Sequence, residues 1–199
     1  MKKNSVFNLI LLGDPTAGKA TQAKRLVRRY PLREFDFGEW LRNLKSKSAR
    51  KKFRMSERVE KGILAPTELA QMKFKEVIFK TPRSRGIFFN GNPKKFVEAK
   101  AMYKWFRDAG RPDPLVVYLS IPKREMLKRI EIRERTERRS DDRSSHVRNR
   151  MNYYARDIRA VVSFLKGKYR FKKISGLGTR DEVYKRLISH IERELARSN

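Results

Sequence analysis

Residues 13–21, with the sequence GDPTAGKAT, combine two glycines and a lysine at a spacing that suits phosphate binding. They follow the apolar run 6–12, which predicts a buried strand, and precede a helix expected to begin near Lys19. A loop of this shape turns main-chain N–H groups inward toward a phosphate chain, and its lysine reaches the outer phosphates. The N-terminus of the following helix adds partial positive charge at the same place. The segment therefore predicts a site for a nucleoside triphosphate.

The composition sets outer bounds on the class of protein. A chain of 199 residues is long enough for one well-packed domain. The absence of cysteine excludes disulfides, thiol catalysis and cysteine-ligated metals, and it suits a reducing cytoplasm, where we expect the protein to act. No apolar run approaches the length of a membrane span, so we expect no membrane association. The formal charge of +29 favours polyanionic partners, RNA among them. The basic residues are spread along the chain, however, so most are interpreted as solvated helix faces.

Apolar runs bounded by turn residues predict parallel strands, with helical patterns between them. The strands are expected near 6–12, 33–37, 86–90, 114–120 and 170–174. The helices are expected at about 18–29, 38–45, 48–61, 67–80, 94–108, 123–134, 142–166 and 180–196, with Pro93 in a first helical turn. This alternation predicts an α/β fold, a five-stranded parallel sheet with helices on both faces. Two segments are interpreted as inserts, 38–66 and 134–140.

Seven motifs in a fixed order extend this interpretation over nearly the whole chain. They occupy residues 13–22, 36–42, 62–66, 86–102, 129–133, 139–142 with 150, and 176–178. On these residues the chain resembles adenylate kinase and its nucleoside monophosphate kinase relatives, and specifically the branch of the family with a short lid.

The resemblance implies a P-loop NTPase three-layer core with two small inserted flaps. The core would comprise 1–37, 67–133 and 141–199, the acceptor-nucleotide insert 38–66, and the lid 134–140. The implied activity is transfer of the terminal phosphoryl group of ATP to AMP or another nucleoside monophosphate, with Mg²⁺, by a monomeric enzyme. Such a transfer depends on positioning and charge neutralisation, so a cleft rich in arginine and lysine is expected.

The resemblance also assigns roles to individual residues. The catalytic cations would be Lys19, Arg133, Arg139 and Arg150. The donor nucleotide would be held by Gly13, Asp14, Pro15, Thr16, Ala17, Gly18, Lys19, Ala20, Thr21, Arg129, Gly176 and Gly178, with Arg129 stacked on the base. The acceptor would be held by Phe37, Gly38, Arg42, Leu64, Ala65, Gly91, Lys94, Glu98, Arg139 and Arg150. Asp141 and Asp142 would hold the lid arginines. No residue would bind the metal directly; Thr21 and Asn90 would hold it through water.

Several positions depart from the family pattern around the donor phosphates. Asn90 stands in place of an aspartate, which is expected to lower metal affinity because an amide carries no charge. Asp14 adds an acid to the loop, where it would repel phosphate or recruit the metal. Thr16 and Ala20 replace glycines, and threonine tolerates a positive φ poorly, so a slightly reshaped loop is expected.

The acceptor site departs further. Lys94 replaces an arginine, which turns a two-point phosphate grip into one point, and Phe37 occupies the place of a small hydroxyl residue. Glu98 replaces the glutamine that reads adenine. An ionised carboxylate only accepts hydrogen bonds, so it would suit guanine or cytosine better than adenine. GMP or CMP would then compete with AMP. The alternative is a plain ion pair between Lys94 and Glu98, four residues apart on one helix.

Two other functions stay open at this point. The clustered departures would fit a catalytically weakened nucleotide-binding protein, although Lys19, Arg42, Arg133, Arg139 and Arg150 are all retained. The large positive charge would fit binding of RNA, with the kinase fold as a scaffold, and such binding would show a steep dependence on salt.

Overall fold

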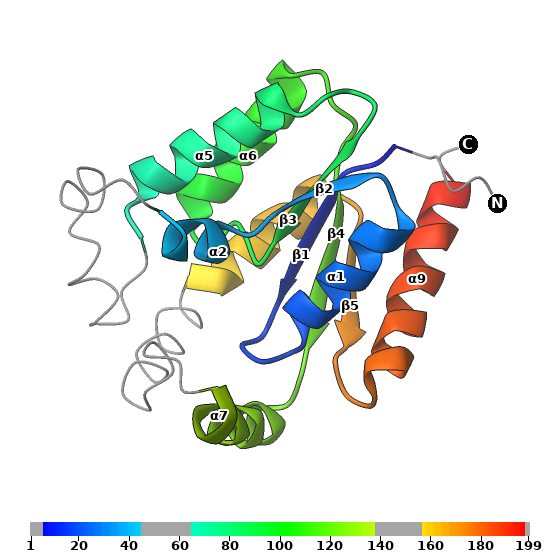
Figure 1. Ribbon diagram of the computed structural model, residues 1–199. Coiled ribbons are helices and arrows are strands. Elements are labelled where there is room, and N and C mark those ends of the chain that lie inside the picture. Colours follow the sequence, from blue (N-terminus) through cyan, green and yellow to red (C-terminus); the bar gives the residue numbers. More distant parts are fainter. Residues whose placement is uncertain (1–5, 45–64, 138–156, 198–199) are drawn as a thin grey trace.

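The computed structural model describes residues 6–44, 65–137 and 157–197. A parallel five-stranded sheet lies at its centre, in the order β2 (Leu32–Phe35), β3 (Gly86–Asn90), β1 (Leu9–Gly13), β4 (Leu115–Ser120) and β5 (Phe171–Ser175). The surrounding helices are α1 (Lys19–Arg29), α2 (Phe37–Arg42), α5 (Thr67–Lys80), α6 (Phe96–Asp108), α7 (Lys123–Glu137) and α9 (Arg180–Ala196) (Figure 1). Residues 157–168 form a further helix.

The sheet separates two hydrophobic cores, which makes the fold three layers deep. One core packs α5, α6 and the helix 157–168 against the sheet, and the other packs α1 and α9 against the opposite face. The expected fold class, a parallel α/β sheet covered on both faces, is confirmed. No helix within the described ranges is long and apolar enough to cross a membrane.

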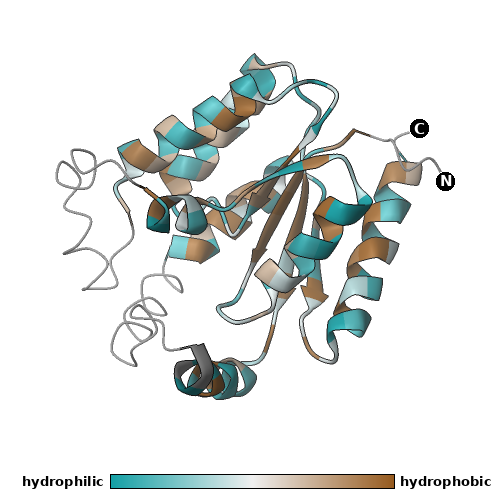
Figure 2. Ribbon diagram, in the orientation of Figure 1, coloured by the Kyte–Doolittle hydropathy of each residue, from teal (hydrophilic) through white to brown (hydrophobic). Residues whose placement is uncertain are grey.

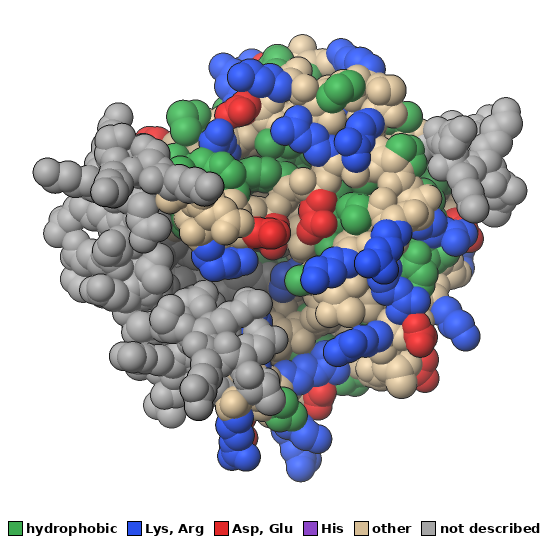
Figure 3. Space-filling view, viewed as in Figure 1, with side chains coloured by type: hydrophobic (Ala, Val, Ile, Leu, Met, Phe, Trp, Pro, Cys, Tyr) green, Lys and Arg blue, Asp and Glu red, His purple; other side chains and the backbone are tan. Residues whose placement is uncertain are grey.

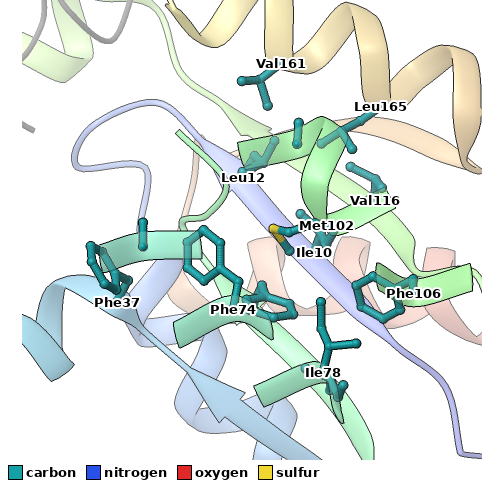
Figure 4. Close-up of a cluster of buried hydrophobic side chains, with 14 of the residues drawn as sticks. Ile10, Leu12, Phe37, Phe74, Ile78, Met102, Phe106, Val116, Val161 and Leu165 are labelled. Carbon is teal, nitrogen blue, oxygen red and sulfur yellow. The ribbon is translucent and has the colours of Figure 1, made fainter. Parts of the chain in front are cut away.

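Strand β1 shows why the sequence folds in this way. Its side chains alternate between the two cores, with Ile10 and Leu12 in one and Leu9 and Leu11 in the other. A strand buried on both faces is apolar at every position, which is visible as continuous brown in Figure 2. Figure 4 shows the core beneath α5 and α6, where Phe74 and Phe106 reach toward the strands.

Most of the expected elements lie within one or two residues of their predicted bounds, but a few boundaries differ. The strand expected at 6–12 begins at Leu9, and the one expected at 33–37 ends at Phe35. Asp36 then caps α2, because its Oδ1 accepts a 3.0 Å hydrogen bond from the Glu39 N–H. Pro93 follows a cis peptide bond and α6 begins only at Phe96, so its expected place in a helical turn is wrong.

The inserts are described only in part. Residues 134–137 of the expected lid continue α7 as helix. The expected helix 48–61 and the start of the expected helix 142–166 lie outside the described residues, as do residues 45–64 of the acceptor insert and 138–140 of the lid.

Because all five strands are parallel, their carboxyl ends share one edge of the sheet. The loop after β1, the N-terminus of α2, the segment between β3 and α6 and the segment after β5 all gather there. In open α/β sheets this edge is where ligands bind.

Candidate active site

Lys19 is held inside the loop that follows β1. Its Nζ donates hydrogen bonds to the main-chain oxygens of Gly13 and Asp14, both at 2.8 Å. The Lys19 pKa is lowered to about 8, first by burial and then by the nearby ammonium group of Lys94, while the carboxylates of Asp14 and Asp36 oppose the shift. Arg133 also contributes to the lowering. Three residues assigned from the sequence, Lys19, Lys94 and Arg133, are thus electrostatic neighbours.

This grouping brings cations from three parts of the chain to one place. Lys19 begins α1, Lys94 lies between β3 and α6, and Arg133 lies in α7. Figure 3 shows basic side chains on this face of the molecule, with acidic ones near its centre. Like charges raise one another's free energy, so the group favours an anion placed between them.

The carboxylate of Asp14 faces away from the loop interior. Its Oδ1 accepts a 2.6 Å hydrogen bond from the Tyr118 hydroxyl, and its Oδ2 accepts a 2.8 Å bond from the Ile121 N–H. The Asp14 N–H in turn donates to the Leu119 oxygen at 2.9 Å. Both carboxylate oxygens are therefore bonded to β4 and its end, while the charge of Asp14 still acts on Lys19. Repulsion of phosphate or recruitment of the metal by Asp14 stays a prediction.

Thr16 adopts the left-handed conformation that the sequence pattern led us to expect for a glycine. Its φ is 59°, which a β-branched residue rarely takes. Its hydroxyl donates to the Pro15 oxygen at 2.6 Å and lies 3.4 Å from the Met126 oxygen in α7. The loop is thus fastened to α7 at its most strained residue.

Arg129 connects the three segments around the expected donor base. Its Nη1 donates to the main-chain oxygens of Thr16 and Gly176, both at 3.3 Å, and its Nε pairs with Glu125 at 2.6 Å. Gly176 approaches closely: a Cβ there would lie 3.1 Å from the Ala17 oxygen, so a larger residue would push the two segments apart. The structure therefore brings Thr16, Arg129 and Gly176 together, and stacking of Arg129 on a base stays a prediction.

On the acceptor side, Phe37 belongs to the hydrophobic core. It is 5% exposed, its ring stacks on Trp40 with centroids 5.5 Å apart, and it meets Phe74 edge-on at 5.6 Å (Figure 4). The Lys73 ammonium lies 5.0 Å from the centre of the Trp40 ring. On the same helix, Arg42 is exposed, and its Nη1 would lie 3.4 Å from a Cβ at Gly38.

Glu98 caps the start of α6. It is 3% exposed, and its Oε2 accepts hydrogen bonds from the N–H groups of Lys94 at 2.9 Å and Lys95 at 3.2 Å. Burial raises the Glu98 pKa, and those two amides oppose the shift. Oε1 has no partner among the described residues. The Lys95 side chain bonds to the Ala65 oxygen and the Thr67 hydroxyl, both at 3.0 Å, and so ties α6 to the end of the acceptor insert.

One residue of this edge was not singled out from the sequence. Glu34 accepts a 2.8 Å hydrogen bond at its Oε1 from Nδ2 of Asn90, which is 4% exposed. Burial raises the Glu34 pKa, and the carboxylates of Asp36 and Glu39 raise it further, while the bond from Asn90 opposes the shift. The sequence does contain a signal for Glu34. It lies two residues after Leu32 and therefore on the same, buried face of the strand, where a charged residue is unusual.

Five of the residues named from the sequence fall on parts of the chain that the structure leaves undescribed. Arg139, Arg150, Leu64, Asp141 and Asp142 lie outside the described residues. Within the described ranges, no three metal-ligating side chains gather into one group. The Thr21 hydroxyl and the Asn90 amide supply oxygen atoms of the kind that Mg²⁺ prefers, and they fit a metal carried by nucleotide phosphates and held through water.

Comparison with known proteins identifies the family. The adenylate kinase family model matches residues 11–170. The chain belongs to the adenylate kinase family. Adenylate kinase from Thermus thermophilus is 31% identical over 179 residues, which cover 90% of this chain and 94% of the relative. Adenylate kinases from Parabacteroides distasonis and Porphyromonas gingivalis are each 27% identical, covering 92% and 94% of this chain and 96% and 97% of those relatives.

Membership of the adenylate kinase family confirms the resemblance drawn from the motifs. It confirms a P-loop fold and a phosphotransferase of the nucleoside monophosphate kinase class with ATP as donor. The alternative of a weakened nucleotide-binding protein that binds RNA is not favoured by these findings.

Proposed function

We propose that this adenylate kinase family member transfers the terminal phosphoryl group of ATP, carried with Mg²⁺, to AMP or another nucleoside monophosphate. The observation that carries the proposal is the place of Lys19 inside the loop after β1, where its Nζ bonds to the Gly13 and Asp14 oxygens and where the charges of Lys94 and Arg133 act on it. Phosphoryl transfer places negative charge between donor and acceptor, and fixed cations at that point stabilise the transition state.

The donor nucleotide and its transferred group are bound by residues from several segments. Lys19 leaves its two carbonyl partners and binds the outer phosphates of the donor. Thr21 and Asn90 would hold the water shell of Mg²⁺, and the bound metal would neutralise phosphate charge. Arg133 approaches the transferred group together with Arg139 and Arg150. Arg129, already placed between Thr16 and Gly176, covers the donor base.

The acceptor is held through its phosphate and its base. Arg42 and Lys94 bind the phosphate, and Glu98 reads the base through Oε1, the oxygen that does not cap α6. The ionised carboxylate favours guanine or cytosine, because it only accepts hydrogen bonds. The raised Glu98 pKa favours the protonated form, which donates one bond and accepts another and therefore suits adenine.

The test is formation of nucleoside diphosphate from ATP and Mg²⁺ with AMP, GMP, CMP and UMP in parallel. We expect turnover with a clear favourite, loss of at least a hundredfold in kcat for Lys19→Ala, and no loss for Arg28→Ala, an exposed cation at the far end of the same helix. Absence of turnover with every acceptor, while ATP still binds, would contradict the proposal.

Three finer points belong to the same proposal: action in the cytoplasm, action as a monomer, and non-specific contact with polyanions. Exposed cations on neighbouring helices support the last, Lys24 and Arg28 on α1 and Lys185 and Arg193 on α9 (Figure 3). Sedimentation at several protein concentrations tests the monomer. Binding to an RNA homopolymer across a salt series tests the contact, which should weaken steeply and show no sequence preference.

A further inference from the structure

The side-chain amide of Asn90 has its orientation set by a residue on the neighbouring strand. Nδ2 of Asn90 donates to Oε1 of Glu34 at 2.8 Å, and no described residue donates to Oδ1 of Asn90. The main chain around it is also fixed: the Asn90 oxygen accepts from Nδ2 of Asn92 at 3.1 Å, and the Gly91 N–H donates to the Leu11 oxygen at 2.8 Å.

The order of the strands gives this orientation a direction. Strand β3 lies between β2, which carries Glu34, and β1, which runs into the phosphate-binding loop. Because the nitrogen and oxygen of a planar amide point in different directions, an Asn90 amide whose Nδ2 is bonded to β2 directs its Oδ1 away from β2, and β1 is the strand on that side. Lys19 begins α1 directly after β1, and its Cε lies 3.7 Å from where a Cβ at Gly91, the residue after Asn90, would be.

The hydrogen bonding of hydrated Mg²⁺ depends on the direction in which the Asn90 side-chain oxygen points. Water bound to a cation acts as a hydrogen-bond donor, so only an acceptor can hold it. Aspartate has an acceptor on both sides, whereas asparagine has one acceptor and one donor, and a reversed amide would oppose the water with N–H groups.

We propose that Glu34 is a positioning residue that locks the Asn90 amide with its oxygen toward the phosphate site, where it accepts from the water shell of nucleotide-bound Mg²⁺. The proposal rests on the proposed function, because it needs a metal–nucleotide complex in the loop. Glu34 does not touch the metal; it acts through Asn90. The requirement at position 34 is a hydrogen-bond acceptor, and the negative charge is not the essential property.

Four variants distinguish orientation of Asn90 from general stabilisation of the fold. They are Glu34→Ala, Glu34→Gln, Asn90→Asp, and Glu34→Gln combined with Asn90→Asp. Titration calorimetry measures ATP affinity with Mg²⁺ and, separately, with EDTA. Unfolding midpoints are recorded for each variant. Loss of a group that orients a metal-shell residue lowers metal-dependent affinity by about tenfold or more.

We expect Glu34→Ala to weaken binding of ATP with Mg²⁺ about tenfold and binding of ATP in EDTA less than twofold. Glu34→Gln should stay near the unchanged protein, because its Oε1 still accepts from Asn90. In the Asn90→Asp background, Glu34→Gln should not lower the affinity for ATP with Mg²⁺. An aspartate has an acceptor oxygen on both sides and so needs no fixed orientation, and one of its oxygens accepts from the glutamine amide.

Three results would overturn the positioning role of Glu34. The first is an equal loss of ATP affinity with Mg²⁺ and with EDTA in Glu34→Ala, and the second is no loss of ATP affinity in that variant. The third is a loss of ATP affinity in Glu34→Gln as large as in Glu34→Ala. If Glu34→Ala fails to fold, Glu34→Leu, which keeps the bulk without the acceptor, takes its place. Failure of the unchanged protein to bind ATP with Mg²⁺ would count against the proposed function. The experiment therefore distinguishes failure of the proposed function from failure of the positioning role of Glu34.

Discussion

The hydroxyl of Tyr118 in β4 donates a 2.6 Å hydrogen bond to Oδ1 of Asp14, the second residue of the phosphate-binding loop. With the bond from the Ile121 N–H to Oδ2, it uses the charge of Asp14 to fasten the loop to the neighbouring strand. An acid in a loop that binds anions is compatible with that function because donors from β4 and its end hold both of its carboxylate oxygens.

Replacing Tyr118 by Phe removes one of these donors. We expect the free energy of unfolding to fall by about 1.5 kcal/mol, because a hydrogen bond to a charged group is lost from a partly buried site. Chemical denaturation measures the change. Tyr103→Phe is the matched control, since its hydroxyl accepts a 3.2 Å bond from the exposed Arg107, and a change under 0.5 kcal/mol is expected there. Equal effects of the two variants would contradict the anchoring role.

The left-handed conformation of Thr16 predicts a difference between two small replacements. Thr16→Gly and Thr16→Ala both remove the hydroxyl and its bonds, but only glycine adopts a φ of 59° without strain. We expect the glycine variant to be more stable than the alanine variant by about 1 kcal/mol, measured by denaturant unfolding. Greater stability of the alanine variant would show that residue 16 has a different backbone conformation in solution.

The lowered Lys19 pKa predicts proton uptake when ATP binds. A pKa of about 8 leaves Lys19 about half neutral at pH 8, and phosphate oxygens favour the charged form and raise that pKa. Binding at pH 8 should therefore take up about half a proton, binding at pH 6.5 almost none, and affinity should fall as the pH rises above 8. Calorimetry in buffers of different ionisation enthalpy measures the uptake.

Two variants control the proton measurement. Lys94→Ala removes the ammonium group that lowers the Lys19 pKa, so the uptake should shift to higher pH. Lys24→Met, on the exposed side of the same helix, should leave it in place. Identical uptake at pH 6.5 and 8 in the unchanged protein would contradict the assignment.

The raised Glu98 pKa predicts that pH alters acceptor preference. As the pH falls through that pKa, Glu98 takes up a proton and gains a donor, so kcat/KM for AMP should rise relative to GMP and CMP. The ratio is measured by parallel assays from pH 5.5 to 8.5. Glu98→Gln should favour AMP at every pH. An unaltered order of acceptors in Glu98→Gln would remove Glu98 from base recognition.

The sequence predicted the parts of this molecule that depend on local pattern. The continuous apolar run 6–12 marked the central strand because β1 is buried on both faces, and the glycines and lysine after it marked the loop. The roles of Lys19, Lys94 and Arg133 came from the resemblance to the adenylate kinase family, and the structure shows that the charges of Lys94 and Arg133 act on Lys19.

What the sequence missed depends on partners distant along the chain. Asp14 is turned by Tyr118, 104 residues away, and Asn90 is held by Glu34, 56 residues away. Neither separation leaves a trace in local periodicity. Phe37 was assigned to a strand and to the acceptor, yet it begins α2 and packs against Phe74, because the strand ends at Phe35, two residues earlier than expected, and Asp36 caps the helix.

The two carbonyl bonds of Lys19 have a kinetic consequence. In the free protein the ammonium group already lies within the loop, bonded to Gly13 and Asp14. An incoming phosphate chain needs only a rotation of this side chain, and such rotations take picoseconds to nanoseconds. The main chain, fastened to β4 and α7, need not open. The rearrangement of Lys19 is therefore far faster than a loop movement, and we do not expect it to limit capture of the donor.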